Sequence, residues 1–265
     1  MMSTLLVFDG LNILRRCYEA NPAPESPDKA HSAVGVAIAS MYRGLREHSP
    51  THSVAIFDHG GPTWRHALYP DYKANRKPMC AFLAAELGPM WERMAGEGWA
   101  LMAHPGEEAD DTIYGVTEAA IAEGEEVIVS STDKDLVRLV ALGARVYNHF
   151  DREWRDSDFC LRSFLVRPEQ LTDFLALMGD AVDNIPGVDL VGKKTAARYL
   201  AKYGDLRGVL AAAERGDIKG KVGANLVSQK ELALLSYELA SFRSTFSALD
   251  LWWDELEAPG AILKG

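Results

Sequence analysis

The sequence has few cysteines, no long apolar run and no histidines at ligand spacing. Its three cysteines, Cys17, Cys80 and Cys160, are too far apart for a disulfide framework and match no zinc-ligand spacing. We expect them to be small core residues in a reducing cytoplasm. No apolar run approaches the length that spans a bilayer, and no signal peptide is recognisable. These absences predict a cytoplasmic protein that has no membrane partner.

The sequence also lacks an excess of basic residues. It has 38 acidic and 28 basic side chains in 265 residues, which gives a net charge of −10. This balance argues against a nucleic-acid partner only if the acids are spread over the surface. Nine carboxylates described below could instead converge on metal ions, which would leave 29 of the acids against 28 bases. Net charge therefore does not decide the class of partner.

Hydrophobic residues make up 48% of the chain, enough for a core in one large domain or two small ones. Apolar runs predict buried strands at 4–8, 53–57, 99–103, 126–130 and 144–148. Helical periodicity separates these runs, which predicts an α/β fold with a mostly parallel sheet and helices on both faces. After residue 167 the chain reads as all helical. Its tail, which includes Leu251, Trp252 and Trp253, is expected to pack on the body.

Acidic residues follow most of the predicted strands or open the next helix. Because the carboxyl ends of parallel strands meet at one edge of a sheet, these side chains should converge there. So many carboxylates would repel one another unless cations neutralise them, and all-oxygen ligands suit Mg²⁺ or Mn²⁺ rather than Zn²⁺. Two such ions are the usual device for phosphodiester hydrolysis. The set comprises Asp9, Asp58, Glu108, Asp110, Asp111, Asp133 and Asp135, together with Asp180 and Asp183 from the helical half.

Each of these acids also has an ordinary structural interpretation. An Asp after a strand is more often a turn former or a helix N-cap than a metal ligand, and Asp133 is a good N-cap candidate. The neighbouring Glu107 is expected to be simply exposed. Capping does not explain the recurrence of acids at four strand ends, so the metal interpretation depends on the whole set.

Two groups of basic residues could contact phosphates. One interleaves cations with aromatic rings, a pattern that fits phosphate contact with base stacking, although a solvated face and core rings explain it too. It consists of Arg65, Lys73, Arg76 and Lys77 beside Trp64, Tyr69 and Tyr72. The other follows the glycine-bracketed loop 187–192, where a loop that opens a helix favours phosphate binding over a solvated helix face. It consists of Lys193, Lys194, Arg198 and Lys202.

The loop 187–192 is close to a Walker A sequence without being one. A Walker A loop requires Ser or Thr directly after its lysine, but here Lys194 separates Lys193 from Thr195. The loop also follows Asp-Asn-Ile-Pro rather than a buried strand. The pattern therefore does not favour ATP binding.

Seven short motifs occur in a fixed order along the chain. They are Val-Phe-Asp-Gly-Leu-Asn (7–12), Ile-Phe-Asp (56–58), Trp-Arg-His (64–66), Asp-Tyr-Lys-Ala-Asn-Arg (71–76), Glu-Ala-Asp-Asp (108–111), Ser-Thr-Asp-Lys-Asp-Leu (131–136) and Gly-Asp-x-x-Asp-Asn-Ile-Pro-Gly-Val-x-x-x-Gly-x-Lys-Thr-Ala (179–196). Taken in order, these motifs resemble the bacterial and phage 5′ nuclease family, which includes flap endonucleases and the 5′ nuclease domain of DNA polymerase I. The resemblance covers roughly residues 4 to 210, and the shared order of motifs is more specific than any single one.

The resemblance implies a structure-specific 5′–3′ nuclease, most simply a monomer. Its partner would be DNA with a free 5′ end, as in flaps, duplex ends and gapped or nicked structures. A PIN-like α/β body is implied at about 1–165, with a helical arch at about 71–98 that admits the 5′ end. A helical region is implied at 166–265, with a helix-hairpin-helix of the H3TH type at about 176–203 that grips duplex DNA, often around a bound K⁺.

Matched position by position, the acids divide between two Mg²⁺ or Mn²⁺ sites. Asp9, Asp58, Glu108, Asp110 and Asp133 resemble the first site and its shell, and Asp111, Asp135, Asp180 and Asp183 resemble the second. Lys73 matches the catalytic lysine and Arg76 the arch arginine, which together with Asp9 and Asp58 form the implied catalytic set. The implied DNA contacts are Arg65, Tyr72, Lys73, Arg76, Lys77, Gly187, Val188, Gly192, Lys193, Lys194 and Thr195.

The chain departs from the family pattern at two points. Met79-Cys80-Ala81-Phe82 stands where many relatives have an acid, which leaves the arch open in detail. Gly88-Pro89 should break the helical pattern of 79–95, either as a plain turn or as the apex of a mobile arch. No polymerase follows, so we expect a stand-alone enzyme or an excised domain. Because Asp180 and Asp183 are kept, we expect full nuclease activity.

Two other functions stay open. A non-catalytic DNA-structure binder would keep the hairpin but would have no need of so many mutually repelling acids. A metal-dependent phosphohydrolase of small substrates could start from the strand that ends at Asp9. An enzyme of the haloacid-dehalogenase type would, however, have an Asp where Leu11 stands.

Overall fold

The computed structural model describes residues 3–245 and 255–259, which fall into two compact units. The first unit consists of residues 3–61, 78–155, 243–245 and 255–259, and the second of residues 62–77 and 156–242. Residues 62–77 thus pack with the helical half, whereas the domain boundary predicted near residue 165 stays a prediction. The tail residues Leu251, Trp252 and Trp253 lie outside the described residues.

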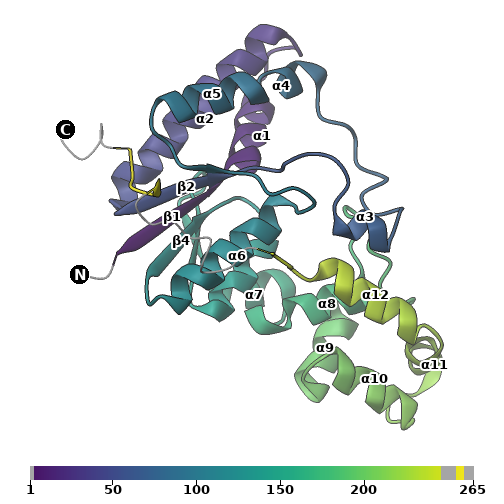
Figure 1. The fold of residues 1–265 in the computed structure, drawn as a ribbon. Helices are drawn as coiled ribbons and strands as arrows, with labels where there is room; N and C mark the ends of the chain where they lie inside the picture. Colours follow the sequence, from purple (N-terminus) through teal and green to yellow (C-terminus); the bar gives the residue numbers. More distant parts are fainter. Residues whose placement is uncertain (1–2, 246–254, 260–265) are drawn as a thin grey trace. The chain divides into compact units, whose positions relative to one another are not determined.

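A six-stranded sheet in the order β3-β2-β1-β4-β5-β6 forms the centre of the first unit (Figure 1). All neighbouring strands pair in parallel except β5 and β6, which are antiparallel. This confirms the predicted mostly parallel sheet. The strands are β1 (Thr4–Asp9), β2 (His52–Ile56), β3 (Leu101–Met102), β4 (Glu126–Ser130), β5 (Arg145–Asn148) and β6 (Glu153–Arg155).

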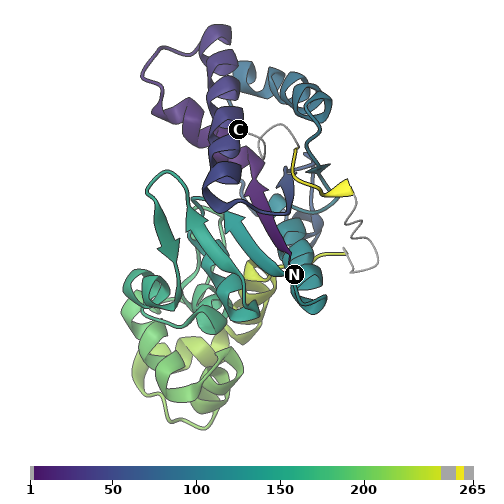
Figure 2. The same cartoon turned by 90° about the vertical axis from the view of Figure 1, so that its left-hand side faces the viewer.

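Helices cover both faces of this sheet, as the strand pattern predicts (Figure 2). Side chains alternate across β1, so Leu6 and Phe8 join a cluster with α1 and α2 on one face. Leu5 and Val7 point to the opposite face, where α6 contacts β1, β2 and β4. The helical segments of this unit are α1 (Gly10–Ala20), α2 (Pro27–His48), α4 (Ala81–Ala85), α5 (Leu87–Gly96), α6 (Ala109–Ala122) and the 3₁₀ helix η1 (Asp135–Leu142).

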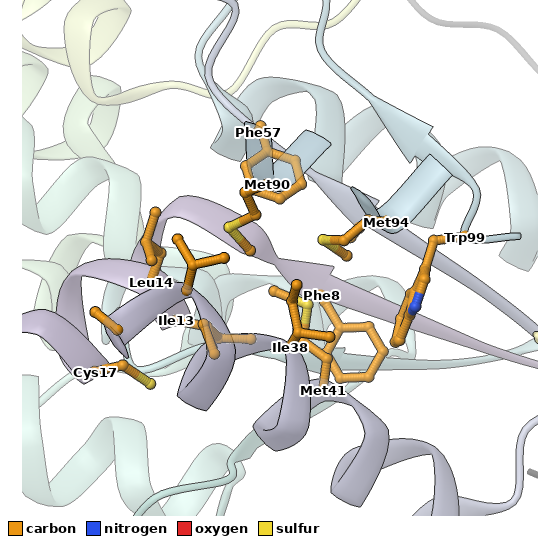
Figure 3. Close-up of a cluster of buried hydrophobic side chains, with 14 of the residues drawn as sticks. Phe8, Ile13, Leu14, Cys17, Ile38, Met41, Phe57, Met90, Met94 and Trp99 are labelled. Atoms are coloured by element: carbon orange, nitrogen blue, oxygen red, sulfur yellow. The ribbon is translucent and has the colours of Figure 1, made fainter. Parts of the chain in front are cut away.

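The segment predicted as a helical arch packs on this core as two short helices. The predicted break is confirmed, but it falls at Glu86, between α4 and α5, rather than at Gly88-Pro89. Proline is tolerated in the first turn of a helix because the first N–H groups have no intrahelical acceptor there. Leu83, Met90 and Met94 are buried in the hydrophobic cluster, in which Met90 and Met94 lie near Phe8 and Phe57 (Figure 3). Their burial is inconsistent with a mobile apex in this stretch.

The second unit is helical, as predicted for the chain after residue 167. Its central helix α8 contacts η2, α9, α10 and α12, and Phe174 and Leu177 are fully buried there. Among the described residues of the chain, no helix has both the length and the apolar character needed to cross a membrane. The helices of this unit are α3 (Trp64–Leu68), α7 (Ser157–Phe164), η2 (Pro168–Gln170), α8 (Leu171–Met178), α9 (Lys193–Tyr203), α10 (Leu206–Glu214), α11 (Gly220–Ser228) and α12 (Lys230–Ala240).

Two glycines of α2 test how tightly this helix packs on β1. A Cβ added at Gly44 would lie 2.8 Å from Phe8 Cε1, and the Phe8 ring is buried and cannot move aside. We expect Gly44→Ala to destabilise the fold by about 1–3 kcal/mol through overpacking. Gly35→Ala, where no neighbouring atom lies within 4 Å, should stabilise the fold by about 0.5–1 kcal/mol. Urea unfolding measures both, and stabilisation by Gly44→Ala would contradict this packing.

Candidate active site

Asp9 occupies the carboxyl end of the central strand β1 and is only 5% exposed. Its Oδ1 accepts a hydrogen bond from the Asn12 amide (3.2 Å) and caps α1, while its Oδ2 accepts one from Ser131 Oγ (2.7 Å). Burial raises the pKa of the Asp9 carboxyl most, and the negative charges of Asp133 and Asp58 raise it too. The hydrogen bonds from Ser131 and the Asn12 amide lower it, and the resulting pKa is about 7.

A polar network joins the ends of β1 and β4 around Asp9. Asn12 Oδ1 accepts hydrogen bonds from the amide (3.0 Å) and the hydroxyl (2.7 Å) of Thr132. Ser131 Oγ accepts the Asp133 amide (2.9 Å), and Asp133 Oδ1 accepts the Asp135 amide (2.8 Å) just before η1. Asn12 and Ser131 were not among the predicted functional residues, although both lie inside the motifs at 7–12 and 131–136. Their position in the sequence close to Asp9 and Asp133 was the feature that could have identified them as functional residues.

The acids around the start of α6 differ in how exposed they are. Asp58 is exposed, and its Oδ1 accepts the Ala109 amide (3.0 Å). Glu108 precedes α6, and Asp110 lies partly buried in the first turn. Asp111 is fully buried, and its oxygens accept the backbone amides of Glu108 (3.2 Å) and Arg243 (2.9 Å). These contacts give Asp111 a structural function, whereas its assignment to the second metal site stays a prediction.

The expectation that Glu107 is exposed was wrong. Its side chain is buried and accepts hydrogen bonds from the hydroxyls of Thr112 (3.2 Å), Ser244 (3.0 Å) and Thr245 (2.8 Å). The Thr245 amide adds a fourth bond at 2.6 Å. Residues 244–245 are far from Glu107 in the sequence, so the local sequence pattern could not predict that Glu107 is buried and hydrogen-bonded to them.

The donor chemistry at this strand edge fits a hard divalent cation. The groups are all oxygen donors, and a buried carboxyl with a raised pKa beside two like charges is an environment that a cation would stabilise. Among the residues that the structure describes, no three His, Cys, Asp or Glu side chains are arranged as a finished metal site. The structure therefore brings Asp9, Asp58 and Asp133 within electrostatic reach of one another, and the assignment of each predicted ligand stays a prediction.

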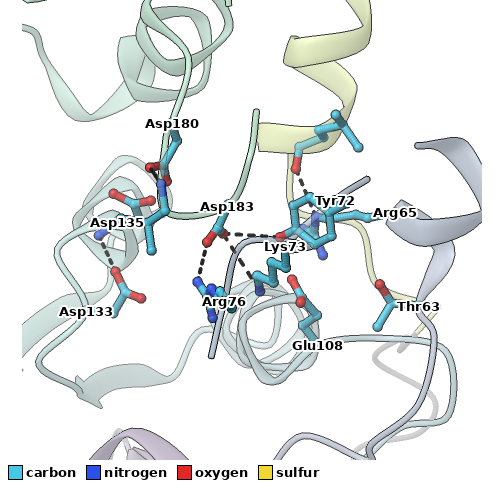
Figure 4. A network of polar contacts seen from close by, with 12 residues as sticks. Thr63, Arg65, Tyr72, Lys73, Arg76, Glu108, Asp133, Asp135, Asp180 and Asp183 are labelled. Atoms are coloured by element: carbon cyan, nitrogen blue, oxygen red, sulfur yellow. Dashed lines mark hydrogen bonds and ion pairs between the residues drawn. The ribbon is translucent and has the colours of Figure 1, made fainter. Parts of the chain in front are cut away.

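In the second unit, the basic loop 71–77 is fastened to Asp183 (Figure 4). Asp183 forms an ion pair with Arg76, lies 3.8 Å from Lys73 Nζ and accepts a hydrogen bond from the Tyr72 hydroxyl (3.3 Å). The Lys73 amide donates to the Asp183 carbonyl (2.9 Å), which holds Lys73 in the left-handed region at φ 56°. Asn184 Nδ2 reinforces the docking through the Asp71 carbonyl (2.7 Å).

Asp180 closes a short turn with Asp183 at its centre. The Asp180 and Ile185 amides and carbonyls exchange hydrogen bonds of 2.9 and 2.8 Å, and Asp180 Oδ1 accepts the Val182 amide (2.8 Å). Burial raises the pKa of Asp180, and the charge of Asp183 raises it further. The turn thus presents two acids on one short segment, as the spacing of three residues predicts.

The DNA contacts predicted for Arg65 and Tyr72 do not fit their positions. Arg65 is 2% exposed, and its guanidinium donates to the carbonyls of Leu239 (2.9 Å) and Ser241 (2.7 Å). Tyr72 is also buried, and its hydroxyl binds Asp183. Burial keeps both side chains away from a ligand. Their hydrogen bonds instead hold the second unit together. Lys77 and Arg76, by contrast, are exposed.

The glycine hairpin divides into a structural half and an open half. Gly187 has φ 68° and would place a Cβ 2.3 Å from the Gly179 nitrogen, so only glycine fits. Its amide donates to Ser236 Oγ (3.0 Å), and the Val188 amide donates to the Leu177 carbonyl (2.9 Å). These two amides are committed to the fold and are not available to a phosphate, whereas the DNA contact predicted for Gly187 and Val188 stays a prediction.

The open half of the hairpin is the start of α9. Gly192 is the N-cap and is exposed, and Lys193 and Lys194 are exposed in the first turn with Thr195 partly buried behind them. The first N–H groups of a helix have no intrahelical acceptor and carry partial positive charge. The predicted phosphate contacts of Gly192, Lys193, Lys194 and Thr195 therefore suit their positions. Lys193 Nζ also donates to the Ser163 carbonyl.

A parallel α/β unit with acids at its strand ends, together with a helical unit that carries a glycine hairpin, is the architecture of a metal-dependent nuclease. Residues 4–163 match the 5′-3′ exonuclease N-terminal resolvase-like domain, and residues 166–261 match the 5′-3′ exonuclease C-terminal SAM fold. The chain belongs to the 5′-3′ exonuclease family and is a structure-specific 5′ nuclease. The resemblance drawn from the motifs is thereby confirmed.

Curated relatives match over most of the chain. It is 32% identical to Flap endonuclease Xni of Serratia proteamaculans (strain 568), over 92% of this chain and 94% of the relative. It is 34% identical to Flap endonuclease Xni of Photorhabdus laumondii subsp. laumondii, over 92% of this chain and 93% of the relative.

Solved structures share the fold. The bacteriophage T5 D15 flap endonuclease, in a pseudo-enzyme-product complex with DNA and metal ions, has a TM-score of 0.72 at 22% identity and covers 89% of this chain and 88% of its own. The catalytic core of Rad2 in complex with DNA substrate has a TM-score of 0.58 at 12% identity and covers 93% and 80%. Both likenesses concern the fold, and the predicted fold class is confirmed.

The raised pKa of Asp9 makes a prediction about stability without metal. Because the folded pKa lies near 7 and the unfolded pKa near 3.8, the folded state loses stability as pH rises from about 4 to about 7. Asp9→Asn abolishes this loss, so at pH 8 in EDTA the variant should be more stable than wild type by about 1 kcal/mol or more. At pH 4 this advantage should vanish.

Thermal unfolding at both pH values measures the effect, and Mg²⁺ at pH 8 should stabilise wild type but not Asp9→Asn. Glu19→Gln, which removes an exposed acid of α1, is the control and should show neither trend. If Asp9→Asn were less stable than wild type at pH 8 in EDTA, the conclusion that the ionised Asp9 carboxylate destabilises the fold would be contradicted.

Proposed function

We propose that the chain hydrolyses phosphodiester bonds of DNA near a free 5′ end, with two divalent ions, Mg²⁺ or Mn²⁺, as cofactors. The observation that carries the proposal is Asp9, a buried carboxyl at the end of the central strand with Asp58 and Asp133 as like-charged neighbours. A protein retains such a destabilising group where its charge is used. The flap endonuclease names of the curated relatives support the substrate class.

In this proposal, Asp9, Asp58, Glu108, Asp110 and Asp133 hold the first ion, and Asp111, Asp135, Asp180 and Asp183 are assigned to the second. Bound divalent ions lower the pKa of a water nucleophile and offset the negative charge that develops on the phosphate. Ser131 and the Asn12 amide orient the two oxygens of Asp9, so the carboxylate keeps a fixed direction without reorganisation. The metal ions in the T5 D15 complex support a metal requirement.

Lys73 and Arg76 supply positive charge for the scissile phosphate. Asp183 holds both side chains on one loop, and the Lys73 amide and the Asp183 carbonyl fix the backbone beneath them. Preorganised cations contribute more to a transition state than mobile ones, because no free energy is used to orient them during the reaction. The Asp183 carboxylate thus has a positioning function for Lys73 and Arg76, whichever ion it also contacts.

The start of α9 would hold the duplex backbone. Gly192 leaves room for a phosphate at the helix N-terminus, where Lys193 and Lys194 add full charges. We retain K⁺ as a further ligand of this hairpin, DNA flaps, ends, gaps and nicks as substrates, and a monomeric enzyme, as the resemblance implies. We also retain a cytoplasmic location, because all three cysteines are free thiols, as in a reducing compartment.

Cleavage of a labelled 5′-flap duplex tests this function. We expect cutting near the flap junction in Mg²⁺ and none in EDTA, with loss of cutting when the 5′ end is blocked by a bulky group. Asp9→Asn should abolish cleavage but leave duplex binding in EDTA unchanged. Binding without cleavage by wild type in Mg²⁺ would instead favour a non-catalytic DNA-structure binder, and phosphate release from a small phosphomonoester would favour a phosphohydrolase.

The basic loop offers a matched pair of variants. Lys73→Ala removes a cation that Asp183 fixes, and we expect kcat to fall by at least about a hundredfold with little change in binding. Lys77→Ala removes an exposed cation four residues away, and we expect at most a few-fold increase in KM. Single-turnover cleavage of the same flap duplex measures both, and equal effects would show that Lys73 acts only through overall charge.

A further inference from the structure

A cavity of about 620 Å³ lies in the first unit between the second half of α2 and the turn that joins β5 to β6. Its walls are Arg43, Arg46 and Glu47 from α2 and His149, Phe150 and Arg152 from the turn. None of these residues belongs to the predicted metal or DNA-binding sets. The volume lies in the range of sites that bind small ligands and cofactors.

The cavity carries more positive charge than its own acid can neutralise. Three arginines face one carboxylate, Glu47, which also accepts the Tyr147 hydroxyl (2.6 Å). Arg43 donates to Ser40 Oγ (3.2 Å). Within the described part of the chain, the guanidinium groups of Arg46 and Arg152 form no hydrogen bond and no ion pair. Both arginines are exposed, so their charge is accessible to an anionic ligand from solution.

His149 adds a buried polar group to the same cavity. Its side chain is only 10% exposed, and its Nδ1 lies 3.5 Å from Glu47 Oε2 without the alignment of a hydrogen bond. No other partner for this nitrogen is found in residues 3–245 and 255–259. A buried polar atom without a hydrogen bond costs free energy, so a ligand that supplies one would be favoured.

The turn that carries Arg152 is held in a costly conformation. Arg152 has φ 53°, a region that L-residues other than Asn, Asp and Gly enter at a cost of roughly 1 kcal/mol. Asn148 fixes the turn by accepting the amides of Phe150 (3.1 Å) and Asp151 (3.3 Å). Strain of this kind is retained where the side chain is needed.

An aromatic ring in the cavity wall suits a ligand that carries a base as well as an anionic group. Phe150 is only partly buried, and its ring lies in edge contact with His149 at 5.8 Å between centroids. The ring also packs against the hydrophobic cluster of the first unit, which fixes its position. A partly exposed, fixed ring beside arginines suits contact with a base next to its phosphate. Glu47 could accept a hydrogen bond from a sugar hydroxyl or from an exocyclic amine of the base.

We propose that this cavity binds a nucleoside phosphate, with its phosphate on Arg46 and Arg152 and its base against Phe150. The ligand is either a free mononucleotide or one nucleotide of a single strand, since both present the same phosphate and base. The site is separate from the acids of the proposed nuclease reaction, and its existence does not depend on that reaction.

Isothermal titration in metal-free, phosphate-free buffer tests the site with three probes: deoxyadenosine 5′-monophosphate, inorganic phosphate and a short oligodeoxyadenylate. Arg46→Gln and Arg152→Asn should each weaken binding of the mononucleotide by about tenfold or more, the loss of one charge-assisted contact. Asn is chosen at 152 because it tolerates the left-handed region. Arg16→Gln, which removes an exposed arginine of α1, is the control and should bind like wild type.

Each outcome decides the proposal. Binding of the mononucleotide alone supports a free-nucleotide site, and tighter binding of the oligonucleotide that also depends on Arg46 supports a strand site. No binding by either probe, or binding that the two variants leave unchanged, overturns the proposal. Inorganic phosphate bound as tightly as the mononucleotide overturns the nucleoside assignment. Flap cleavage by both variants and thermal unfolding of Arg46→Gln should equal those of wild type, whereas Arg152→Asn should unfold at the same or a higher temperature because Asn tolerates the left-handed region. Retained flap cleavage separates this test from that of the nuclease.

Discussion

The burial of the Asp9 carboxyl is the constraint on which the rest of the α/β unit depends. Asp9 ends the central strand, and parallel pairing with β2 and β4 brings the acids after those strands to the same edge. Burial, together with the negative charges of Asp133 and Asp58, raises the pKa of Asp9 to about 7, while the Ser131 hydroxyl and the Asn12 amide hold its two oxygens in place. The fold thus fixes the direction of a carboxylate that it leaves without full electrostatic compensation, which is the state that a divalent cation would relieve.

Where the first unit buries an acidic side chain, the second unit holds long, flexible basic side chains in fixed positions. Lysine and arginine side chains lose considerable rotamer entropy when they are ordered, so an isolated basic loop would be poorly positioned. Asp183 offsets this loss for Lys73 and Arg76 together, and the buried Arg65 and Tyr72 secure the loop to the helices behind it. Although Arg65 and Tyr72 are buried, they thereby fix the position of the loop that carries the charges of Lys73 and Arg76.

The success and failure of the sequence predictions follow the range of the forces involved. Continuous apolar runs identify β1, β2 and β4 because burial on both faces leaves a local signature. The edge strand β6 has three residues and no such signature. Glu107 and Arg65 were misassigned because their partners lie over 130 residues away in the sequence. The residue types within the motifs indicated the chemistry, whereas the division between side chains that face a ligand and those that hold the fold required tertiary contacts.

A net charge of −10 is compatible with a DNA partner because electrostatic attraction at physiological salt is local. Charges more than about 8 Å apart in solvent are largely screened, so a phosphate responds to the few groups nearest to it rather than to the sum over the chain. Exposed cations are concentrated at the start of α9 and on the loop that Asp183 holds, and buried acids contribute little field outside their own edge. When the nine predicted metal ligands are set aside, 29 acids balance 28 bases, so the net charge of the chain does not prevent the surfaces proposed for DNA contact from being basic.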